Sequence, residues 1–311
     1  MMTKGKVLIA APVHNVLING LEAEGYELLL HEKISQEQGM HLIADCVGVI
    51  TSTRLQLNKE MIDAATTLRF IGRMGSGMEV IDVPYAESKG IRCIGSPEGN
   101  CNAVAEHALG MLLSLNKRIL KSHNEIKEGK WLRDENRGTE LEGKTIGIIG
   151  YGHTGKAFAK LLRGFDVRIL VYDKYKKIEN EEHIIPCESL DQIQQEADVL
   201  SLHVPFQEDT YHLIDRIFME KMRKPFILIN TSRGTVIDSR EISTFLDNGG
   251  MKGLVLDVWE EEPLEKMSAH YRVLLNDLIT RNNVLITAHI AGYSHEALFK
   301  MSIILLERIT K

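Results

Sequence analysis

The stretch "IIGYGHTGKAF", Ile148–Phe158, decides the fold, because its glycines at 150, 152 and 155 lie between a β-type run and a helical pattern. The run before it, "TIGIIG" at 145–150, is apolar and rich in isoleucine. The predicted helix after it has one apolar face, formed by Ala157, Phe158, Leu161, Leu162 and Phe165. The next β-type run, "VRILVYD" at 167–173, ends in Asp173. Strand, glycine turn, helix and acid in this order predict a dinucleotide-binding loop.

Each glycine has a separate physical role in such a loop. Gly150 permits the tight turn, Gly152 lets a pyrophosphate approach the backbone, and Gly155 lets helix and strand pack closely. The N–H groups and the dipole at the helix N-terminus favour the bound anion. The Asp173 carboxylate can accept hydrogen bonds from both ribose hydroxyls and would repel a 2′-phosphate, so we expect NAD rather than NADP. The alternative is a glycine-rich turn followed by a surface acid.

β-type runs alternate with helical patterns along the chain, which predicts an α/β protein with parallel sheets covered by helices. The first hundred residues hold five such runs: "KVLIAA", "YELLL", "VGVIT", "LRFIGR" and "IRCIG". Six more follow, enough for a complete dinucleotide-binding sheet: "TIGIIG", "VRILVYD", "VLSLHVP", "FILINTS", "GLVLDVW" and "NVLITAHI". One long helix is predicted over 102–129, and a last helix over 295–310.

Length, charge and cysteine content limit the class of protein. A chain of 311 residues suffices for two domains, and a net charge of −6 does not indicate a nucleic-acid partner. The four cysteines and 12 histidines are scattered without disulfide or metal-ligand spacing. The N-terminal apolar run is typical of a first strand rather than a signal peptide, and no run has the length of a membrane span. We expect a cytoplasmic protein without metal or membrane partner.

Two β-type runs in the second half end in residues suited to oxidising an alcohol, a reaction that needs a base for the hydroxyl proton. Arg233, in "LINTSRGTVID", lies beyond a strand end and suits a substrate carboxylate. A surface arginine that caps a loop would give the same pattern. His289, in "NVLITAHIAGYS", is a natural acid–base if it faces a cofactor, and otherwise a packed core histidine.

A third run, "LDVWEEEP" at 256–263, ends in a group of acids. Asp257 closes the predicted strand, and Glu262 precedes the proline. We interpret Glu260 and Glu261 as solvated loop residues.

Further motifs recur in a fixed order. They are the glycine loop with Asp173, "HVP" at 203–205, "NTSRG" at 230–234, "LDVWEEEP" at 256–263 and "TAHIAG" at 287–292. The first half adds "GRMGSGMEVIDV" at 72–83 and "SPEGNCNAVAEHALGMLL" at 96–113. Together these motifs resemble the D-isomer-specific 2-hydroxyacid dehydrogenase family over nearly the whole chain.

The resemblance implies a role for each segment. Arg233 would bind the substrate carboxylate and polarise its carbonyl, and His289 would exchange the hydroxyl proton. Glu262 would hydrogen-bond His289, orient its ring and raise its pKa. Backbone around Met74, Gly75 and Ser76 would meet the substrate carboxylate. The residues expected to line NAD are Gly150, Gly152, His153, Thr154, Gly155, Asp173, His203, Val204, Pro205, Thr210, Thr231, Ser232 and Asp257, the last near the nicotinamide.

The implied architecture is α/β with two doubly wound domains. A Rossmann NAD-binding domain over 99–287 is inserted in a flavodoxin-like substrate domain formed by 1–98 and 288–311, with a cleft that closes over the ligands. Family members usually dimerise through the NAD-binding domain. We therefore expect a homodimer with "GKWLRDENRG", residues 129–138, in the contact. Trp131 is then an interface anchor, or alternatively a locally packed side chain.

Within the family, the first half is most similar to D-3-phosphoglycerate dehydrogenases, which start serine biosynthesis by oxidising 3-phosphoglycerate. The similarity rests on "GVITSTRLQLNKEMIDAATTLRFIGRMGSGM", "SPEGN" and "IKEGKWLRDENRGTELEGKTIGIIGYG". A phosphorylated substrate needs cations besides Arg233. Arg54 and Arg73 are the candidates, unless they face solvent at strand ends.

Some positions depart from the phosphoglycerate dehydrogenase pattern and weaken the substrate assignment without removing a catalytic group. Thr51 and Ser52 lie where an arginine is usual. Ala288 replaces a proline, and Glu79 and Val80 replace Asp and Asn. The alternatives are a glyoxylate/hydroxypyruvate reductase, a D-lactate-type dehydrogenase, or a non-catalytic NAD-sensing protein similar to the C-terminal-binding corepressors. We expect no C-terminal regulatory domain.

Overall fold

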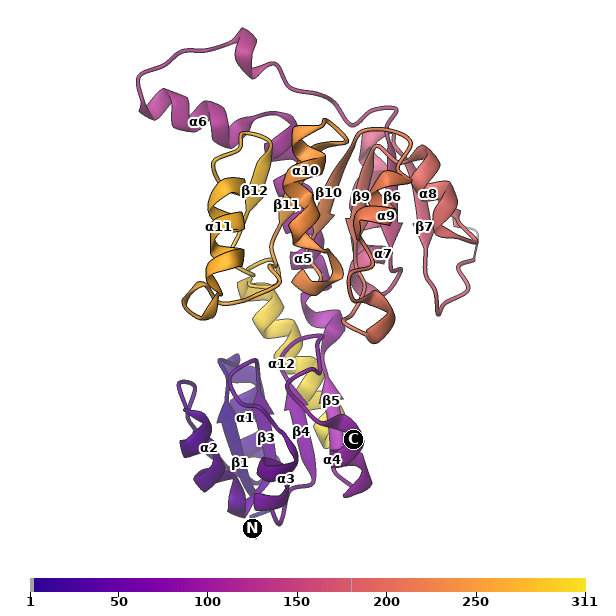
Figure 1. Ribbon diagram of the computed structural model, residues 1–311. Helices are drawn as coiled ribbons and strands as arrows, with labels where there is room; N and C mark the ends of the chain where they lie inside the picture. Colours follow the sequence, from indigo (N-terminus) through magenta and orange to yellow (C-terminus); the bar gives the residue numbers. More distant parts are fainter. Residues whose placement is uncertain (1–2, 180) are drawn as a thin grey trace. The chain divides into compact units, whose positions relative to one another are not determined.

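Two separate parallel sheets organise the chain in the computed structural model, which describes residues 3–179 and 181–311 (Figure 1). One unit comprises the residues up to Ala103 together with Gly292–Lys311, and the other comprises Val104–Ala291. Residues 99–103 thus belong to the first unit and residues 288–291 to the second, which differs from the expected division at both junctions. Helix α5 (Pro97–Asn116) runs without interruption through the first junction.

The first unit has a five-stranded parallel sheet in the order β2-β1-β3-β4-β5, the flavodoxin-like order. All five β-type runs expected in the first half form strands. The strands are β1 (Gly5–Ala10), β2 (Tyr26–Leu30), β3 (Cys46–Thr51), β4 (Phe70–Arg73) and β5 (Arg92–Gly95). The helices are α1 (Asn15–Ala23), α2 (Gln36–Leu42), α3 (Lys59–Ala64), α4 (Val83–Ser88) and α12 (His295–Thr310).

The C-terminal helix α12 completes the core of the first unit. Its side chains Met301 and Leu305 pack with Leu17 and Leu21 of α1 on one face of the sheet. Helices α3 and α4 contribute to the apolar cluster on the other face. Both faces are therefore covered, which explains why the strands are nearly continuous apolar runs.

The second unit has a seven-stranded parallel sheet in the order β12-β11-β10-β9-β6-β7-β8. The strands are β6 (Thr145–Ile149), β7 (Arg168–Tyr172), β8 (Ile184–Pro186), β9 (Val199–Leu202), β10 (Phe226–Asn230), β11 (Met251–Leu256) and β12 (Val284–Ile286). The helices after α5 are α6 (Ile119–Lys127), α7 (His153–Leu162), α8 (Leu190–Glu196), α9 (Arg216–Glu220), α10 (Ile242–Asp247) and α11 (Ala269–Leu278).

The order of strands reverses next to β6. The chain proceeds from β6 to β7 and β8 on one side and then returns to β9 on the other side of β6. Ligands of doubly wound sheets bind at such a switch point, outside the carboxyl ends of the strands. The glycine loop follows β6 directly and so lies at this edge. The predicted fold class is confirmed.

Apolar side chains of both faces bury the second sheet. On one face, α5 and α7 pack on side chains such as Ile146 and Ile148 of β6. On the other face, α8, α9, α10 and α11 pack on side chains such as Leu200 and Leu228. Because successive side chains of a strand point to opposite faces, each strand contributes to both apolar layers. The strands are thereby held in place and support the loops at their carboxyl ends.

Two sequence predictions differ from the structure. Strand β8 is not predicted, because its 3 residues are too few to show a period. The single helix expected over 102–129 is wrong: α5 ends at Asn116, and Arg118 adopts a left-handed φ of 54° before α6 begins. The Asn116 carbonyl oxygen instead accepts a hydrogen bond from Thr139 N–H at 3.0 Å, and this contact takes the place of a further helical turn.

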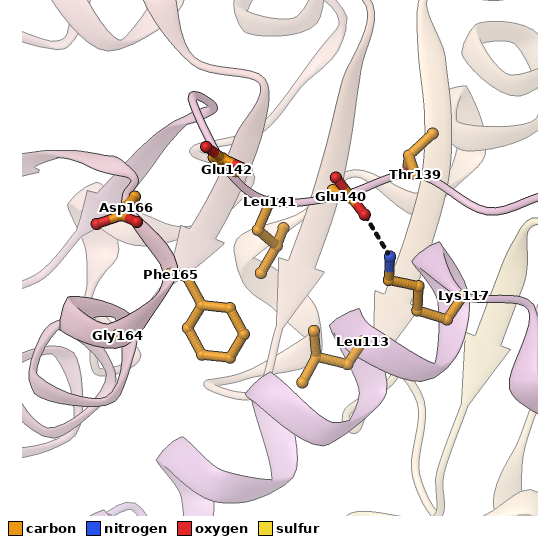
Figure 2. A pocket seen from close by; sticks show the side chains of 9 residues that line it. All are labelled: Leu113, Lys117, Thr139, Glu140, Leu141, Glu142, Gly164, Phe165 and Asp166. Atoms are coloured by element: carbon orange, nitrogen blue, oxygen red, sulfur yellow. Dashed lines mark ion pairs between the residues drawn. The ribbon is translucent and has the colours of Figure 1, made fainter.

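A surface hollow lies at the amino edge of the second sheet (Figure 2). It is lined by Leu113, Lys117, Thr139, Glu140, Leu141, Glu142, Gly164, Phe165 and Asp166. Residues 139–142 precede β6 and Asp166 precedes β7, whereas the glycine loop follows β6. The hollow is thus at the opposite edge from the glycine loop, and we assign it no catalytic role.

Every helix within residues 3–179 and 181–311 is too short or too polar to span a lipid bilayer.

Candidate active site

The glycine loop has room for a ligand at one glycine and none at the other two. Gly150 has a φ of +93°, and a Cβ there would lie 2.5 Å from the carbonyl oxygen of His203. A Cβ on Gly155 would collide with the carbonyl oxygen of Gly150. A Cβ on Gly152, in contrast, meets no described atom within 4 Å. The open space above Gly152 is where a pyrophosphate would approach the backbone, so the loop fits NAD.

Helix α7 begins directly after this glycine. Its N-cap is Gly152, and no side chain caps the helix. His153 and Thr154 form the first turn. The N–H groups at such an N-terminus and the helix dipole favour an anion.

Asp173 follows β7 and is tied to the glycine loop. Its Oδ2 accepts a hydrogen bond from Tyr151 N–H at 2.8 Å, and its Oδ1 accepts from Tyr175 N–H and Lys176 N–H, each at 3.0 Å. The carboxylate therefore has a fixed orientation beside the loop. A carboxylate oxygen has more than one acceptor position, so Oδ2 retains capacity for a ribose hydroxyl.

We expect Asp173→Ala to reduce the preference for NAD over NADP by about tenfold or more, because it removes a like charge that would face the 2′-phosphate, and tenfold corresponds to about 1.4 kcal/mol. The measurement is the ratio of kcat/KM for NAD and NADP. Asp173→Asn is the matched control for the hydrogen bond to Tyr151, since an amide oxygen still accepts it. An unchanged ratio in both variants would mean that another residue reads the ribose.

The segment after β9 holds its expected cofactor residues in place by local hydrogen bonds. Thr210 donates its hydroxyl to the Pro205 carbonyl oxygen at 2.8 Å and accepts from Gln207 N–H at 2.8 Å. His203 Nε2 lies 2.9 Å from Ser201 Oγ, and its buried Nδ1 has no hydrogen-bond partner among the described residues. Burial lowers the pKa of His203 to about 3, so its ring is neutral. Val204 continues directly from His203.

The Asn230 amide shapes the loop that carries Arg233. Its Nδ2 donates to the Arg233 carbonyl oxygen at 2.9 Å, and its Oδ1 accepts from both N–H and Oγ of Ser232. The neighbouring Thr231 Oγ1 is buried without a partner among the described residues. Arg233 Nη1 donates to the Ser232 carbonyl oxygen at 2.7 Å. The arginine thus leaves the carboxyl end of β10 from a loop whose backbone is locked.

Asp257 is buried and holds the segment that bears His289. Its Oδ1 accepts from Thr287 Oγ1 at 2.6 Å and from Ile290 N–H at 2.8 Å, and its Oδ2 accepts from Ala291 N–H at 2.7 Å. Its carbonyl oxygen accepts from His289 N–H at 2.7 Å. Both carboxylate oxygens are therefore engaged by residues 287–291, which makes Asp257 first of all a support for that segment.

His289 and Glu262 form a hydrogen-bonded pair. Nδ1 of His289 donates to Oε2 of Glu262 at 2.7 Å, and Oε1 of Glu262 accepts from Trp259 N–H at 2.8 Å. The side chains are 47% and 34% exposed, respectively. Nε2 of His289 makes no hydrogen bond with another described residue, so the second ring nitrogen is open to a substrate.

The hydrogen-bonded pair shifts the pKa of both side chains. The hydrogen bond that His289 donates to Glu262 raises the pKa of His289, against the effect of burial and of the Arg233 charge. Burial alone would raise the pKa of Glu262, but the hydrogen bond and charge of His289, with help from Trp259 N–H and Arg233, hold it below its ordinary value. Imidazolium and carboxylate stabilise one another. His289 also has a left-handed φ of 54°, which the hydrogen bonds from the segment to Asp257 maintain.

For Glu262→Gln we expect the pKa of His289 to fall toward its ordinary value, because the amide keeps a hydrogen-bond acceptor but loses the negative charge. In the acid–base role expected for His289, reduction of a keto acid would use the protonated ring, so kcat/KM for reduction should be highest at low pH and fall as pH rises through that pKa. The variant should show this fall at lower pH than the unmodified protein. The pH profile of kcat/KM is the measurement, and an unmoved profile would contradict the pairing.

The expected substrate residues of the first unit lie around the end of β4. Arg73 is only 8% exposed and donates through Nη1 to the Met74 carbonyl oxygen. Ser96 Oγ accepts from Gly75 N–H at 3.2 Å and donates to the Arg73 carbonyl oxygen at 3.1 Å. Ser76 is exposed. The Arg73 side chain is thus buried and does not face solvent at the end of β4.

Arg54 lies in an exposed turn after β3. Of the two arginines considered for a substrate phosphate, it is the one with an exposed side chain.

One cluster among the described residues has the donor types of a metal site: His212, Asp238 and Glu260. However, Glu260 Oε2 lies 2.9 Å from Nε2 of His212, whereas Asp238 Oδ2 lies 3.8 Å from Nδ1. The two carboxylates meet opposite nitrogens of one ring, and a single ion cannot bind both edges. Asp238 also pairs with Arg240 through both of its oxygens. We assign no metal to this cluster.

Comparison with known proteins decides the family. Residues 109–291 match the model described as D-isomer specific 2-hydroxyacid dehydrogenase, NAD binding domain. The chain belongs to the D-isomer-specific 2-hydroxyacid dehydrogenase family. The expected resemblance is confirmed, and the matched segment is the NAD-binding domain of these dehydrogenases.

Relatives within the family carry different substrate names. D-3-phosphoglycerate dehydrogenase of Archaeoglobus fulgidus is 32% identical over 305 residues, which cover 98% of this chain and 56% of that protein. The chain thus spans about half the length of this relative. Hydroxypyruvate reductase of Thermotoga maritima is 33% identical over 301 residues, 94% of this chain and 95% of that protein. D-lactate dehydrogenase of Aquifex aeolicus, complexed with NAD and lactic acid, has a TM-score of 0.84 at 26% identity, covering 98% of this chain and 94% of that one.

Sequence reasoning missed two residues that support this site, Glu260 and His107. The interpretation of Glu260 as solvated is wrong, since its side chain is 5% exposed and accepts hydrogen bonds from three groups. Glu261, as expected, keeps partial exposure and accepts from Ser268 N–H. His107 of α5 lies 3.0 Å from Thr287 Oγ1, behind Asp257. The available signal for His107 was a titratable side chain within the motif "SPEGNCNAVAEHALGMLL" at 96–113.

Proposed function

We propose that the chain catalyses reversible hydride transfer between NAD and C2 of a D-2-hydroxy acid. The observation that carries this proposal is the hydrogen bond between His289 and Glu262 in the unit that also holds the glycine loop and Arg233. A base with an open nitrogen, a carboxylate that supports it and a cation for the substrate carboxylate are the groups this reaction requires.

The residues at the carboxyl edge of the second sheet would hold the cofactor. Gly152 leaves space for the pyrophosphate, Gly150 and Gly155 allow the close backbone packing of the loop, and Asp173 would bind the ribose hydroxyls. Bound NAD would supply the hydride acceptor, and NADH the hydride donor. The remaining chemistry is that of the protein's own side chains.

Arg233 and His289 act on two groups attached to C2 of the substrate, the carboxylate and the 2-hydroxyl group. The Arg233 guanidinium binds the carboxylate and polarises the neighbouring C2 oxygen. During oxidation, Nε2 of His289 accepts the proton of the 2-hydroxyl group as the hydride leaves C2, and a keto acid results. During reduction, the same nitrogen returns the proton to the oxygen. Glu262 stabilises the imidazolium that exists between these events.

The proposed substrate pair is 3-phosphoglycerate and 3-phosphohydroxypyruvate, which would place the chain in serine biosynthesis. Two observations support it: the similarity to the phosphoglycerate dehydrogenase of A. fulgidus, and the exposed Arg54 as a cation for the phosphate.

Hydroxypyruvate and glyoxylate are the second candidate substrates. The similarity to the T. maritima reductase extends over nearly all of that protein. Arg73, the other arginine considered for the phosphate, is buried. A substrate without a phosphate would need neither arginine.

An assay of purified protein separates these candidates. NADH formation is followed with NAD and 3-phosphoglycerate, and NADH consumption with phosphohydroxypyruvate, hydroxypyruvate, glyoxylate and pyruvate. Turnover confined to the phosphorylated pair supports the first candidate, and Arg54→Ala should then raise its KM. Turnover of unphosphorylated acids alone supports the second. Binding of NAD without turnover of any acid would overturn the proposed catalysis.

We further propose that two copies associate through α6 and residues 129–138. Trp131 is 79% exposed, so it is not locally packed. Lys121 Nζ donates to Asn136 Oδ1 at 2.9 Å, which ties the segment to α6. Other exposed apolar side chains of this surface are Ile119, Leu120, Ile126 and Leu132. In Figure 1, α6 and the segment after it project from the second sheet. A dimer mass by sedimentation equilibrium would support the association.

A further inference from the structure

Glu260 is a buried acid that the proposed mechanism does not use. It belongs to the acid loop, residues 257–263, which also carries Glu262. Its side chain is 5% exposed. A buried carboxylate destabilises the fold unless hydrogen bonds satisfy it. The hydrogen-bond partners of Glu260 therefore identify the segments that it connects.

Those partners come from three other segments. Oε1 of Glu260 accepts from Ser239 N–H at 2.8 Å. Oε2 accepts from His212 Nε2 at 2.9 Å and from Tyr271 Oη of α11 at 3.0 Å. Burial, followed by the charge of Glu260, raises the pKa of Tyr271 to about 12, so this hydroxyl keeps its proton and donates.

Ser239 belongs to the arginine loop, residues 231–241, which carries Arg233. The arginine loop also carries an acid of its own on the other side of His212: Asp238 Oδ2 lies 3.8 Å from His212 Nδ1. Arg240 donates to both oxygens of Asp238 at 2.8 and 2.6 Å. His212 thus lies between an acid of each loop, and the two loops are connected twice.

The backbones of the two loops also meet directly. A Cβ on Gly234 would collide with the backbone of Trp259 and Glu260. Arg233 therefore precedes a point at which the arginine loop touches the acid loop. A shift of one loop along the other would alter the separation of Arg233 from Glu262.

We propose that Glu260 is a positioning residue that fixes the acid loop against the arginine loop and so sets the placement of Glu262 relative to Arg233 and His289. This inference rests on the proposed function. Glu260 binds neither substrate nor cofactor; it acts through the backbone of 259–262. Trp259 N–H, which holds Oε1 of Glu262, belongs to the residue directly before Glu260.

Removing the tie should weaken the hydrogen bond between Glu262 and His289. Glu260→Ala leaves Ser239 N–H, the Tyr271 hydroxyl and His212 without their buried acceptor. Glu260→Gln is milder, because its amide oxygen still accepts from Ser239 N–H while its NH₂ cannot accept from Tyr271 or His212. The groups that then face His289 are Glu262, Asp257 and Arg233. Glu262 and Asp257 both belong to the acid loop, but hydrogen bonds from residues 287–291 hold Asp257 in place.

The test measures the pKa of His289 by NMR of histidine-labelled protein, with the resonance assigned by its loss in His289→Ala. We expect this pKa to fall in Glu260→Gln and further in Glu260→Ala. We also expect kcat to fall by about 10- to 100-fold, as for a small misplacement of catalytic groups. The Kd of NADH should be nearly unchanged. Glu261→Gln, the adjacent acid outside the network, is the control that should leave both the pKa and kcat unaltered.

Two results would overturn the inference. One is an unchanged His289 pKa and kcat in a folded Glu260→Gln protein. The other is a loss of thermal stability and NADH affinity with the pKa of His289 unmoved, which would show a purely structural residue. If Glu260→Ala does not fold, Tyr271→Phe removes one donor of the network and should give a smaller shift in the same direction. The NMR measurement needs no turnover, so it remains decisive even if the proposed reaction fails.

Discussion

His289→Ala should lower kcat by about 10²- to 10⁴-fold in both directions, the contribution typical of a positioned general acid–base. The physical reason is that Nε2 of His289 makes no hydrogen bond with another described residue and is open to the substrate, while Nδ1 donates to Glu262 at 2.7 Å and fixes the ring. NAD affinity should stay nearly the same, because the glycine loop and Asp173 make no hydrogen bond to His289. Steady-state kinetics and titration of NADH fluorescence measure the two quantities.

The control for this variant is His41→Ala, at an exposed position in α2 of the first unit. It should leave kcat and NADH affinity unaltered. Full activity in His289→Ala would contradict the role of His289. Loss of NADH binding with an intact fold would place this histidine in the cofactor site instead.

Arg233→Ala should lower kcat/KM for the hydroxy acid by about 30- to 4,000-fold, since loss of one partner from a charged hydrogen-bonded pair costs about 2–5 kcal/mol. Much of the loss should appear in the KM of the acid. Arg233→Lys should recover part of it, because lysine restores the charge but not the planar fork that binds a carboxylate through two nitrogens. Initial-rate kinetics with varied acid concentration measure the effect.

Arg216→Ala is the matched control, because Arg216 is an exposed arginine of α9 whose partner is Glu220. An equal loss in this control would point to net charge rather than to Arg233. Equal KM values for Arg233→Ala and the unmodified protein would exclude Arg233 from carboxylate binding.

The sequence predicts best what is local. Strand, glycine loop and helix are neighbours in sequence, and the chemistry of Gly150 and Gly155 depends on backbone atoms a few residues away or on the adjacent strand. The family was also predictable, because its motifs are short and occur in a fixed order. The role of each site residue stays a prediction until the variants are measured.

Features that depend on distant partners were not predictable in this way. The environment of Glu260 is set by Ser239, His212 and Tyr271, which come from separate segments. Its sequence context, an acidic triplet before a proline, is that of a solvated loop. Likewise, the break between α5 and α6 depends on Thr139, which returns to the Asn116 carbonyl from beyond α6. The helical periodicity of the sequence alone does not predict that contact.

The buried Asp257 carboxylate has a consequence for hydrogen exchange with solvent. Residues 288–290 are exposed, yet the N–H groups of Ile290 and Ala291 point at its two oxygens, and that of His289 points at its carbonyl. Amide protons held in this way exchange only when the segment opens. The backbone N–H groups of the turn that presents His289 to solvent should therefore exchange with deuterium as slowly as those of the interior strands beside it.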